Sequence, residues 1–430
     1  MQQNGKLQSN KQRGLVLFLI LITVSLMVVS CEKKPEDFIT SGTCGDNLTW
    51  QFNDNGTLTI SGEGTMTDYW FQSTPWFPIS EKIKTIIIEN GVTTVGSWAF
   101  DRCYNLTSVE LPNTITIIKY NAFCFCRSLK SMQIPNTVTS IGNYAFRECK
   151  SLTSLEIPNS ITFIGTLAFY GCSGLTSLSI SNSVTTIKEH TFAYCSNLTS
   201  VEIPNSVITI GGEAFAYCQK LASVTISNSV ATIGGSAFYY TNLTSVEIPS
   251  SVTTIGISAF SACNNLISIN VDIDNSNYCS NDGVLYNKSQ DIIICYPEGK
   301  TGIVAIPNTV ITIGSNAFSH CEKLTSVTIP NSVTKIENAA FSNCSGLTSV
   351  TIGNSVSMIG SYAFGGCRNL KSINCKATFP PSIVIYNNEP GISTFEGVPT
   401  NMPVYVPCKT LSTYKNSNWG KVFSKISEDC

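Results

Sequence analysis

Charge is scarce in this chain of 430 residues, of which only 13% are Asp, Glu, Lys or Arg. Soluble domains usually carry about twice that share, ~25%. The 26 Lys and Arg residues nearly balance the 28 Asp and Glu residues and form no basic block. This argues against a nucleic-acid partner, because phosphate binding needs clustered cations. Disorder is excluded, because 43% of the residues are hydrophobic and can build a core.

Histidine is almost absent, with only His190 and His320 in the chain. They lie in variable positions several repeats apart, so neither can activate a nearby serine or cysteine nucleophile. The sequence also has no HExxH motif, CxxC pair, Gly-rich phosphate loop or nucleotide-binding fingerprint. We therefore expect no catalytic residues, no metal site and no cofactor.

A hydrophobic run long enough to cross a membrane is also missing. A basic N-terminus precedes a largely apolar stretch from Leu15 to Val29, whereas a transmembrane helix needs about 20 apolar residues. The stretch ends in Val-Val-Ser-Cys at Cys31, which resembles the lipobox of bacterial lipoproteins. The resemblance implies a signal peptide at 1–30, a lipid on the thiol of Cys31 and a tether at 31–42. The alternative is an ordinary cleaved signal followed by a chance cysteine.

The charged residues from Glu32 to Asp37 resemble the surface-export signals of some Gram-negative lipoproteins. Together with the lipobox, they imply a location in the bacterial outer membrane, exposed at the cell surface.

What the chain has in abundance is one repeated unit. Its marker is a small residue followed by Phe, and a cysteine stands three residues after the Phe in ten of eleven copies. Most copies are 23 residues apart, with one step of 22 and one of 58. The Phe residues are Phe100, Phe123, Phe146, Phe169, Phe192, Phe215, Phe238, Phe260, Phe318, Phe341 and Phe364. The cysteines form a series that we call the cysteine ladder: Cys103, Cys126, Cys149, Cys172, Cys195, Cys218, Cys263, Cys321, Cys344 and Cys367.

One copy shows the expected local structure. Small and apolar residues between Ile141 and Leu152 fall on one helical face, which predicts a short α or 3₁₀ segment. Leu155 and Ile157 then flank an outward Glu156, which predicts a short strand ended by a Pro-Asn turn. A unit this small cannot bury its own apolar side, so stacked copies must share one core.

The Leu-x-x-Leu-x-Leu pattern, followed by a turn and a small-Phe-x-x-Cys element, resembles the leucine-rich repeats of the BspA-like surface protein family over residues 41–426. The resemblance implies a right-handed solenoid with a parallel sheet on its concave side, short helical or 3₁₀ segments and β-hairpin caps. It implies an N-terminal β cap at 43–80, a solenoid at 81–375 with a hairpin insert at about 272–300, and a C-terminal cap at 376–430.

Two hypotheses account for the cysteine ladder. Identical repeats point their Cβ atoms in parallel, which favours buried free thiols over stacked disulfides or soft-metal sites. Thr241, which replaces cysteine in the remaining copy and cannot form a bridge, supports the same choice. Cys279 and Cys295 flank the insert hairpin and could form a disulfide. No spacing signal distinguishes Cys44, Cys124, Cys408 and Cys430.

Two sets of outward residues are candidates for ligand binding. The first is an aromatic row beside the repeated Phe, made of Phe125, Tyr170, Tyr194, Tyr217, Tyr239 and Tyr240. Tyrosine is enriched at binding hot spots because it offers a large apolar area with a polar tip. The second is an acidic series at alternate outward strand positions, made of Glu156, Glu202 and Glu247. As structural alternatives, the rings could only cover the flank of the solenoid, and the glutamates could only maintain solubility.

The family resemblance implies a lipid-anchored surface adhesin or binding scaffold. Its expected ligands are host matrix proteins, other cells or glycans, and its lipid binds the membrane. One alternative is a glycan-capture lipoprotein of an uptake system, in which the aromatic row would hold the sugar. Another is a purely structural envelope protein.

Overall fold

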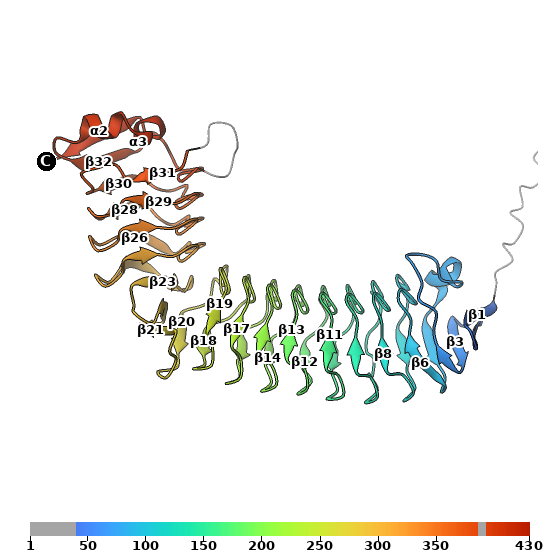
Figure 1. Cartoon of the computed structure of the whole chain (residues 1–430). Helices are drawn as coiled ribbons and strands as arrows, with labels where there is room; N and C mark the ends of the chain where they lie inside the picture. Colours follow the sequence, from blue (N-terminus) through green and yellow to red (C-terminus); the bar gives the residue numbers. More distant parts are fainter. Residues whose placement is uncertain (1–39, 386–392) are drawn as a thin grey trace, which may run out of the picture. The chain divides into compact units, whose positions relative to one another are not determined.

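The computed structural model describes residues 40–385 and 393–430. The expected signal peptide and Cys31 lie outside the described residues. Residues from Ser41 onward form one compact unit, a parallel β-solenoid of about 15 turns with a period of ~23 residues (Figure 1). The expectation of a repeat solenoid is thus confirmed. Among the described helices, none is long and apolar enough to cross a membrane.

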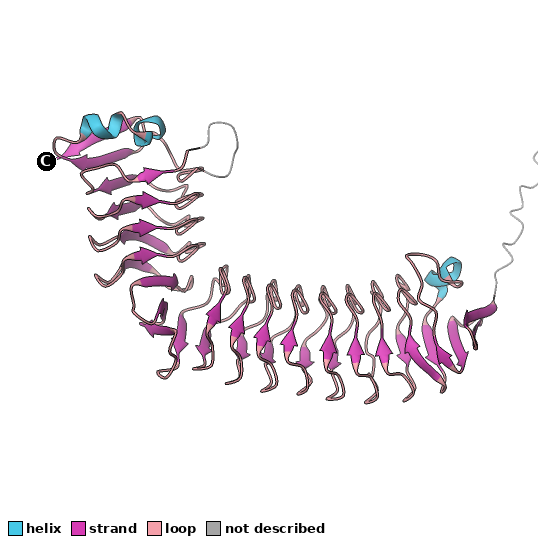
Figure 2. Cartoon of the chain, in the orientation of Figure 1, coloured by secondary structure: helices cyan, strands magenta, loops and turns pink. Residues whose placement is uncertain are grey.

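Most repeats contribute one short strand at each of two positions (Figure 2). In the copy analysed above, β10 (Ser154–Glu156) is the expected strand, and it pairs in parallel with β12 (Ser177–Ser179) of the next repeat. A second strand, β11 (Phe163–Ile164), follows the Pro-Asn turn and pairs in parallel with β9 (Ser140–Ile141). The sequence pattern did not predict this second strand, because two residues are too few to show alternation.

The remaining strands follow the same two positions. In the first position lie β5 (Thr85–Ile88), β7 (Ser108–Glu110), β14 (Ser200–Glu202), β16 (Ser223–Thr225), β18 (Ser245–Ile248), β20 (Ser268–Val271), β24 (Gly302–Ala305), β26 (Leu324–Thr328), β28 (Ser349–Ile352) and β30 (Ser372–Cys375). In the second lie β4 (Gly64–Thr65), β6 (Val92–Val95), β8 (Ile117–Ile118), β13 (Thr186–Ile187), β15 (Thr209–Ile210), β17 (Thr232–Ile233), β19 (Thr254–Ile255), β25 (Thr312–Ile313), β27 (Lys335–Ile336), β29 (Met358–Ile359) and β31 (Ser382–Ile383).

Neither set forms one continuous ladder. The first set is divided into one sheet that contains β5-β7, the pairs β10-β12, β14-β16 and β18-β20, and one sheet that contains β24-β26-β28-β30. The second set forms three longer sheets, β4-β6-β8-β9-β11, β13-β15-β17-β19 and one that contains β25-β27-β29-β31.

The segment around each repeated Phe consists of turns, so the helical segment expected between Ile141 and Leu152 is wrong. Tyr144 and Glu148, two residues before and after Phe146, have φ angles of 59° and 62°. This left-handed backbone interrupts any right-handed helix. The amide of Phe146 instead donates to the carbonyl of Ala168 in the next repeat at 2.8 Å. Apolar spacing alone cannot separate this arrangement from a helix, because both place the same residues inside.

The Phe side chains form a buried stack along the solenoid. The rings of Phe146 and Phe169, for example, lie 5.2 Å apart at an interplanar angle of 3°. The stack starts on Trp76, resumes on Tyr296 after the insert and ends on Phe395, three aromatic residues outside the Phe series detected in the sequence. Each repeat therefore buries its ring between its neighbours' rings, which no single repeat could do alone.

Antiparallel strands cover the N-terminal end. β2 (Leu48–Phe52) and β3 (Thr57–Gly62) form a hairpin in which Trp50 lies opposite Ile60, and β1 (Ser41–Gly45) pairs with the outer side of β2. β3 then pairs in parallel with β5 of the solenoid. A 3₁₀ helix, η1 (Phe77–Lys82), precedes β5. The hairpin thus occupies the backbone edge that an uncapped repeat would expose.

The insert is a three-stranded meander of β21 (Tyr278–Asn281), β22 (Val284–Asn287) and β23 (Ile292–Cys295). The expected disulfide between Cys279 and Cys295 is wrong, because both thiols are free. Cys279 lies opposite Tyr286 on one side of β22, and Cys295 lies opposite Leu285 on the other. A whole strand separates the two cysteines, about twice the ~4.8 Å strand spacing, which exceeds the reach of a disulfide.

The C-terminal end is covered by β32 (Pro403–Pro407), α2 (Leu411–Lys415), α3 (Asn418–Val422) and β33 (Lys425–Asp429). β32 and β33 are parallel, with Pro407 opposite Asp429. Cys408 and Cys430 follow these two residues and form a disulfide with a Cα–Cα distance of 5.4 Å. The sequence showed no sign of this pair, because the register of two strands brings the cysteines together.

Candidate functional site

The cysteine ladder is a column of buried free thiols that bond neighbouring repeats. The thiol of Cys172, for example, donates to the carbonyl oxygen of Phe146 in the preceding repeat at 3.2 Å. The same bond to the preceding repeat is made by Cys126, Cys149, Cys195, Cys218, Cys263, Cys344 and Cys367. Burial raises the pKa of Cys149 well above its ordinary value, so this thiol is a poor nucleophile. The ladder therefore serves the fold.

Thr241 takes the cysteine position in the short repeat and stays within hydrogen-bond reach of the column. Its hydroxyl donates to the carbonyl oxygen of Phe238 in its own repeat at 3.0 Å and lies 3.1 Å from the sulfur of Cys263. The cysteine position therefore accepts threonine as well, because both side chains are small and can form a hydrogen bond.

The structure brings the predicted tyrosines together into one row, which we call the tyrosine row: Tyr170, Tyr194, Tyr217, Tyr239 and Tyr240. Tyr194 and Tyr217 stack with centroids 4.4 Å apart at 12°, and Tyr170 lies 5.0 Å from Tyr194. Tyr217 in turn contacts both Tyr239 and Tyr240, at 5.4 and 5.6 Å. The two most exposed members, Tyr194 and Tyr240, keep 40% and 41% of their surface accessible.

The stacking of the rings determines which parts of the tyrosine row a ligand can contact. Tyr194 and Tyr217 cover one face of each other's ring, while Tyr170 contacts Tyr194, and Tyr239 and Tyr240 contact Tyr217. Partial burial, with the neighbouring phenols as a further cause, raises the pKa of Tyr194, Tyr217 and Tyr239. These phenols therefore stay protonated at neutral pH and can donate hydrogen bonds. A sugar ring that needs an open aromatic face finds little of it on these two rings.

The predicted glutamates lie on a separate part of the surface. Glu156, Glu202 and Glu247 are exposed at outward positions of β10, β14 and β18. Their neighbours in register are neutral, and the amide of Asn270 donates to Glu247 at 2.7 Å. The tyrosine row instead lies at the turns beside the Phe stack, so the two predicted sets do not form a single site.

Arginine extends the aromatic row toward the N-terminus, a feature that the sequence analysis missed. The guanidinium carbon of Arg147 lies 5.4 Å from the ring centre of Tyr170 and 5.5 Å from that of Phe125. The guanidinium carbon of Arg102, in the preceding repeat, lies 5.1 Å from the ring centre of Phe125. Both arginines occupy the one or two positions after a repeated Phe, as the tyrosines do. Applying the 23-residue register to charge as well as to rings would have found them.

The C-terminal repeats use the corresponding positions for polar links between repeats. The hydroxyls of Ser319 and Ser342 lie 2.8 Å apart, and Asn343 lies 3.5 Å from the ring of His320. His190, the other histidine, lies 3.4 Å from Glu213. Within residues 40–385 and 393–430, no group of three or more His, Cys, Asp and Glu side chains could hold a metal ion.

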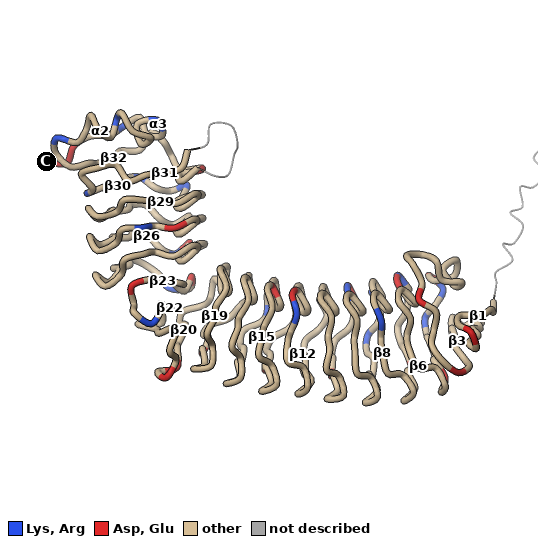
Figure 3. The backbone as a smooth tube through the Cα atoms, viewed as in Figure 1, with Lys and Arg blue, Asp and Glu red and all other residues tan. Residues whose placement is uncertain are grey.

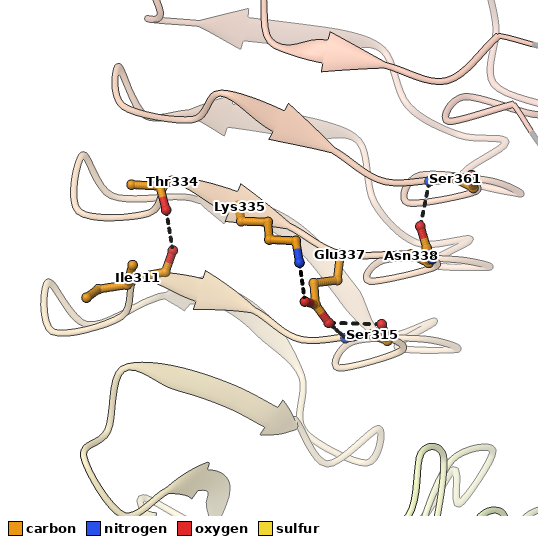
Figure 4. A network of polar contacts seen from close by, with 7 residues as sticks. All are labelled: Ile311, Ser315, Thr334, Lys335, Glu337, Asn338 and Ser361. Carbon is orange, nitrogen blue, oxygen red and sulfur yellow. Dashed lines mark hydrogen bonds and ion pairs between the residues drawn. The ribbon is translucent and has the colours of Figure 1, made fainter.

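Polar side chains at and after the second strand position of the C-terminal repeats also form hydrogen bonds. Glu337 accepts hydrogen bonds from the amide and hydroxyl of Ser315 and from Lys335, the last at 2.7 Å (Figure 4). The bond from Lys335 lowers the pKa of Glu337. Asn338 accepts a hydrogen bond from the amide of Ser361 in the next repeat at 2.9 Å. These groups hold repeats together.

Backbone hydrogen bonds connect the turns beside the Phe stack from one repeat to the next. Where the insert interrupts this series, a buried glutamate replaces the carbonyl acceptor. Elsewhere the amide two residues after each Phe donates to a backbone carbonyl of the next repeat, as Tyr217 does to Tyr239. At the last repeat before the insert, the amide of Ala262 donates instead to the carboxyl group of Glu298 at 2.5 Å. Burial raises the pKa of Glu298 to about 8, so the carboxyl group is largely protonated at neutral pH.

The family model described as a BspA type Leucine rich repeat region of six copies matches residues 76–199, 185–297 and 294–387. A leucine-rich cell surface protein from Faecalibacterium prausnitzii is similar in structure, with 27% identity over 91% of this chain and 95% of its own, and a TM-score of 0.56. A leucine-rich repeat protein from Bacteroides ovatus has the same fold, with 24% identity over 90% and 99% of the two chains and a TM-score of 0.59. No curated protein matches the chain significantly.

Proposed function

Because the chain belongs to the BspA-type leucine-rich repeat family, we propose that it is a binding scaffold on the bacterial surface. In this proposal it is an adhesin for host matrix proteins or other cells, anchored in the outer membrane by a lipid on Cys31. It acts through an extended surface and carries out no catalysis. The likeness to a cell surface protein of Faecalibacterium prausnitzii supports the location. The Cys408–Cys430 disulfide supports export, because such bonds persist outside the reducing cytosol.

The tyrosine row is the observation that carries the proposal. Its rings lie on successive repeats and Tyr194 and Tyr240 are exposed, so an extended protein surface could contact several repeats at once. Each ring is held by its neighbours, so little rotamer entropy remains to be lost on binding. Rigid tyrosines, which combine a large apolar ring with a polar tip, are typical hot-spot residues in protein interfaces.

The test is the simultaneous replacement of Tyr194, Tyr217 and Tyr240 by Ser, followed by binding to a panel of matrix proteins and a glycan array. With each anchor worth ~1–2 kcal/mol, protein binding should weaken at least tenfold while the melting temperature barely changes. A matched control is the double change His320→Ser and Asn343→Ser. These residues occupy the same register and the same left-handed backbone in the C-terminal repeats.

The outcomes separate the alternatives. Unchanged protein binding would move the ligand site to the outward strand positions of Glu156, Glu202 and Glu247 or to the insert. Loss of folding in the triple variant would make the tyrosine row a structural cover. Binding confined to neutral glycans would favour glycan capture for uptake, a function that the covered ring faces do not favour. No ligand on either panel would favour a structural envelope protein.

A further inference from the structure

Three arginines lie among aromatic rings in the N-terminal repeats, and we call them the arginine cluster: Arg102, Arg127 and Arg147. All three approach the ring of Phe125, with guanidinium carbons 5.1, 5.5 and 5.5 Å from its centre. Outer rings flank them, with Arg102 4.7 Å from Phe71, Arg127 5.2 Å from Tyr104 and Arg147 5.4 Å from Tyr170. The cluster thus has one central ring and comes from three consecutive repeats.

Most of this positive charge is not neutralised. In the part of the chain that the structure describes, the side chains of Arg127 and Arg147 form no ion pair with a carboxylate and donate no hydrogen bond. Arg102 lies 3.4 Å from the carboxyl group of Asp101 and donates to the hydroxyl of Tyr104 at 3.1 Å. The nearest other acid along the chain, Glu148, already pairs with Lys150 at 3.0 Å.

The position of the guanidinium groups among the aromatic rings determines which groups of the arginine cluster a ligand can contact. A guanidinium whose face lies on a ring keeps its N–H donors in the plane, pointing away from the ring. Aromatic rings are negative on their faces and attract cations within about 6 Å, and the three guanidinium carbons lie 5.1–5.5 Å from the ring centre of Phe125. Arg127 is exposed and the side chain of Arg102 is 34% accessible, so guanidinium donors of the cluster reach solvent, although the Nε atoms of Arg102 and Arg147 are buried without a hydrogen-bond partner. Such a surface attracts an anion with planar or tetrahedral oxygens. It has little open ring face for nucleobases to stack on.

We propose that the arginine cluster binds an acidic polysaccharide, through its carboxylate or sulfate groups. The cations recur from one repeat to the next, and a polysaccharide with an acid group in each repeating unit presents anions at regular intervals. An acidic peptide would have to be ordered along the row at a greater cost in entropy. Charged positions of both signs are sparse along the backbone tube, and acidic as well as basic ones occur in the N-terminal repeats (Figure 3). The proposal does not depend on a protein ligand for the tyrosine row.

The test measures binding of the purified protein to heparin oligosaccharides, which carry sulfates, and to polygalacturonate, which carries only carboxylates. The variant is the double change Arg127→Gln and Arg147→Gln, and the matched control is Arg368→Gln. Arg368 stands four residues after its repeated Phe, as Arg127 does, but glycines replace the neighbouring rings. We expect the double variant to weaken binding to at least one polysaccharide tenfold or more, and the control to change it less than twofold. Which of the two polysaccharides responds identifies the acid group.

A second variant, Phe125→Leu, keeps all three charges and removes the central ring. It should also weaken binding, because the guanidinium groups lose their support. Polyglutamate and an oligothymidylate are the competing probes, and melting temperatures verify that each variant is folded. Three results would overturn the proposal: full binding by the double variant, tighter binding of either competing probe, or equal loss in the Arg368 control. The tyrosine triple variant should still bind the polysaccharide. A failure of the tyrosine-row proposal can therefore be distinguished from a failure of the arginine-cluster proposal.

Discussion

The thiol of Cys149 donates a hydrogen bond to the carbonyl oxygen of Phe123, 26 residues earlier in the chain, at 3.3 Å. The same carbonyl accepts the amide of Cys126 within its own turn. One buried oxygen thus joins a local turn to the next repeat. The ladder is therefore both packing and hydrogen bonding, where the sequence had suggested packing alone.

Removing that thiol should destabilise the solenoid in a graded way. We expect Cys149→Ala to lower the free energy of unfolding by about 1–3 kcal/mol, from lost contacts and a lost buried hydrogen bond. Cys149→Ser should cost less, because a hydroxyl can make the same bond, and Phe146→Ala should cost about 3–5 kcal/mol. Denaturant unfolding measures all three. Cys279→Ser, in the partly exposed insert, is the control, and an equal effect there would contradict a special role for the ladder.

Thiol titration should show how many cysteines are free thiols and how many are disulfide-bonded. Under denaturing, non-reducing conditions, we expect all ten ladder cysteines to react as free thiols, because none of them is bonded to another. Peptide mapping of the same sample should find Cys408 joined to Cys430. A titration that found almost no free thiol would refute the buried-thiol ladder, and a peptide linking Cys279 to Cys295 would refute the strand order of the insert.

Stability should fall as pH rises toward 8, and Glu298 should be a cause. Its pKa is raised from 4.5 to about 8 by burial, with Glu322 as a further cause. Between these values the folded chain holds a proton that the unfolded chain has lost, so folding weakens by up to about 1.4 kcal/mol per pH unit. Asp101, with a pKa of about 6, acts with the same sign at lower pH, and His320, with a lowered pKa, acts with the opposite sign.

Glu298→Gln isolates this contribution, since an amide oxygen can still accept from Ala262 and the other groups titrate equally in both proteins. The difference in melting temperature between variant and wild type should grow from pH 5 to pH 8, with the variant more stable at the upper end. A constant difference over this range would show that Glu298 is ionised in the folded protein.

Anchoring should depend on Cys31 alone. Because only the acyl chains are expected to hold the mature protein to the membrane, Cys31→Ser should leave a precursor that is not processed or a protein that is released. Fractionation of cells and the mass of the N-terminal peptide measure both. Cys279→Ser should remain in the membrane fraction. Correct cleavage together with full membrane association of Cys31→Ser would refute the lipobox.

The repeat, the solenoid and the buried residues follow from the amino-acid sequence alone. A 23-residue period with one Phe and one cysteine per copy leaves stacking as the only way to bury those side chains, and stacking aligns equivalent positions. The tyrosine row follows directly, because Tyr194 and Tyr217 are equivalent residues of adjacent repeats. Period and composition were sufficient for the burial of the repeated side chains and for the alignment of equivalent positions.

Features that break the register or depend on backbone direction emerge only from the folded chain. Left-handed residues such as Tyr144 turn an apparently helical spacing into turns, because φ is not encoded in an apolar pattern. Strand order separated Cys279 from Cys295, and strand register joined Cys408 to Cys430. The arginine cluster depends on long side chains that reach across repeats, so its contacts with Phe125 follow from geometry that spacing alone does not contain.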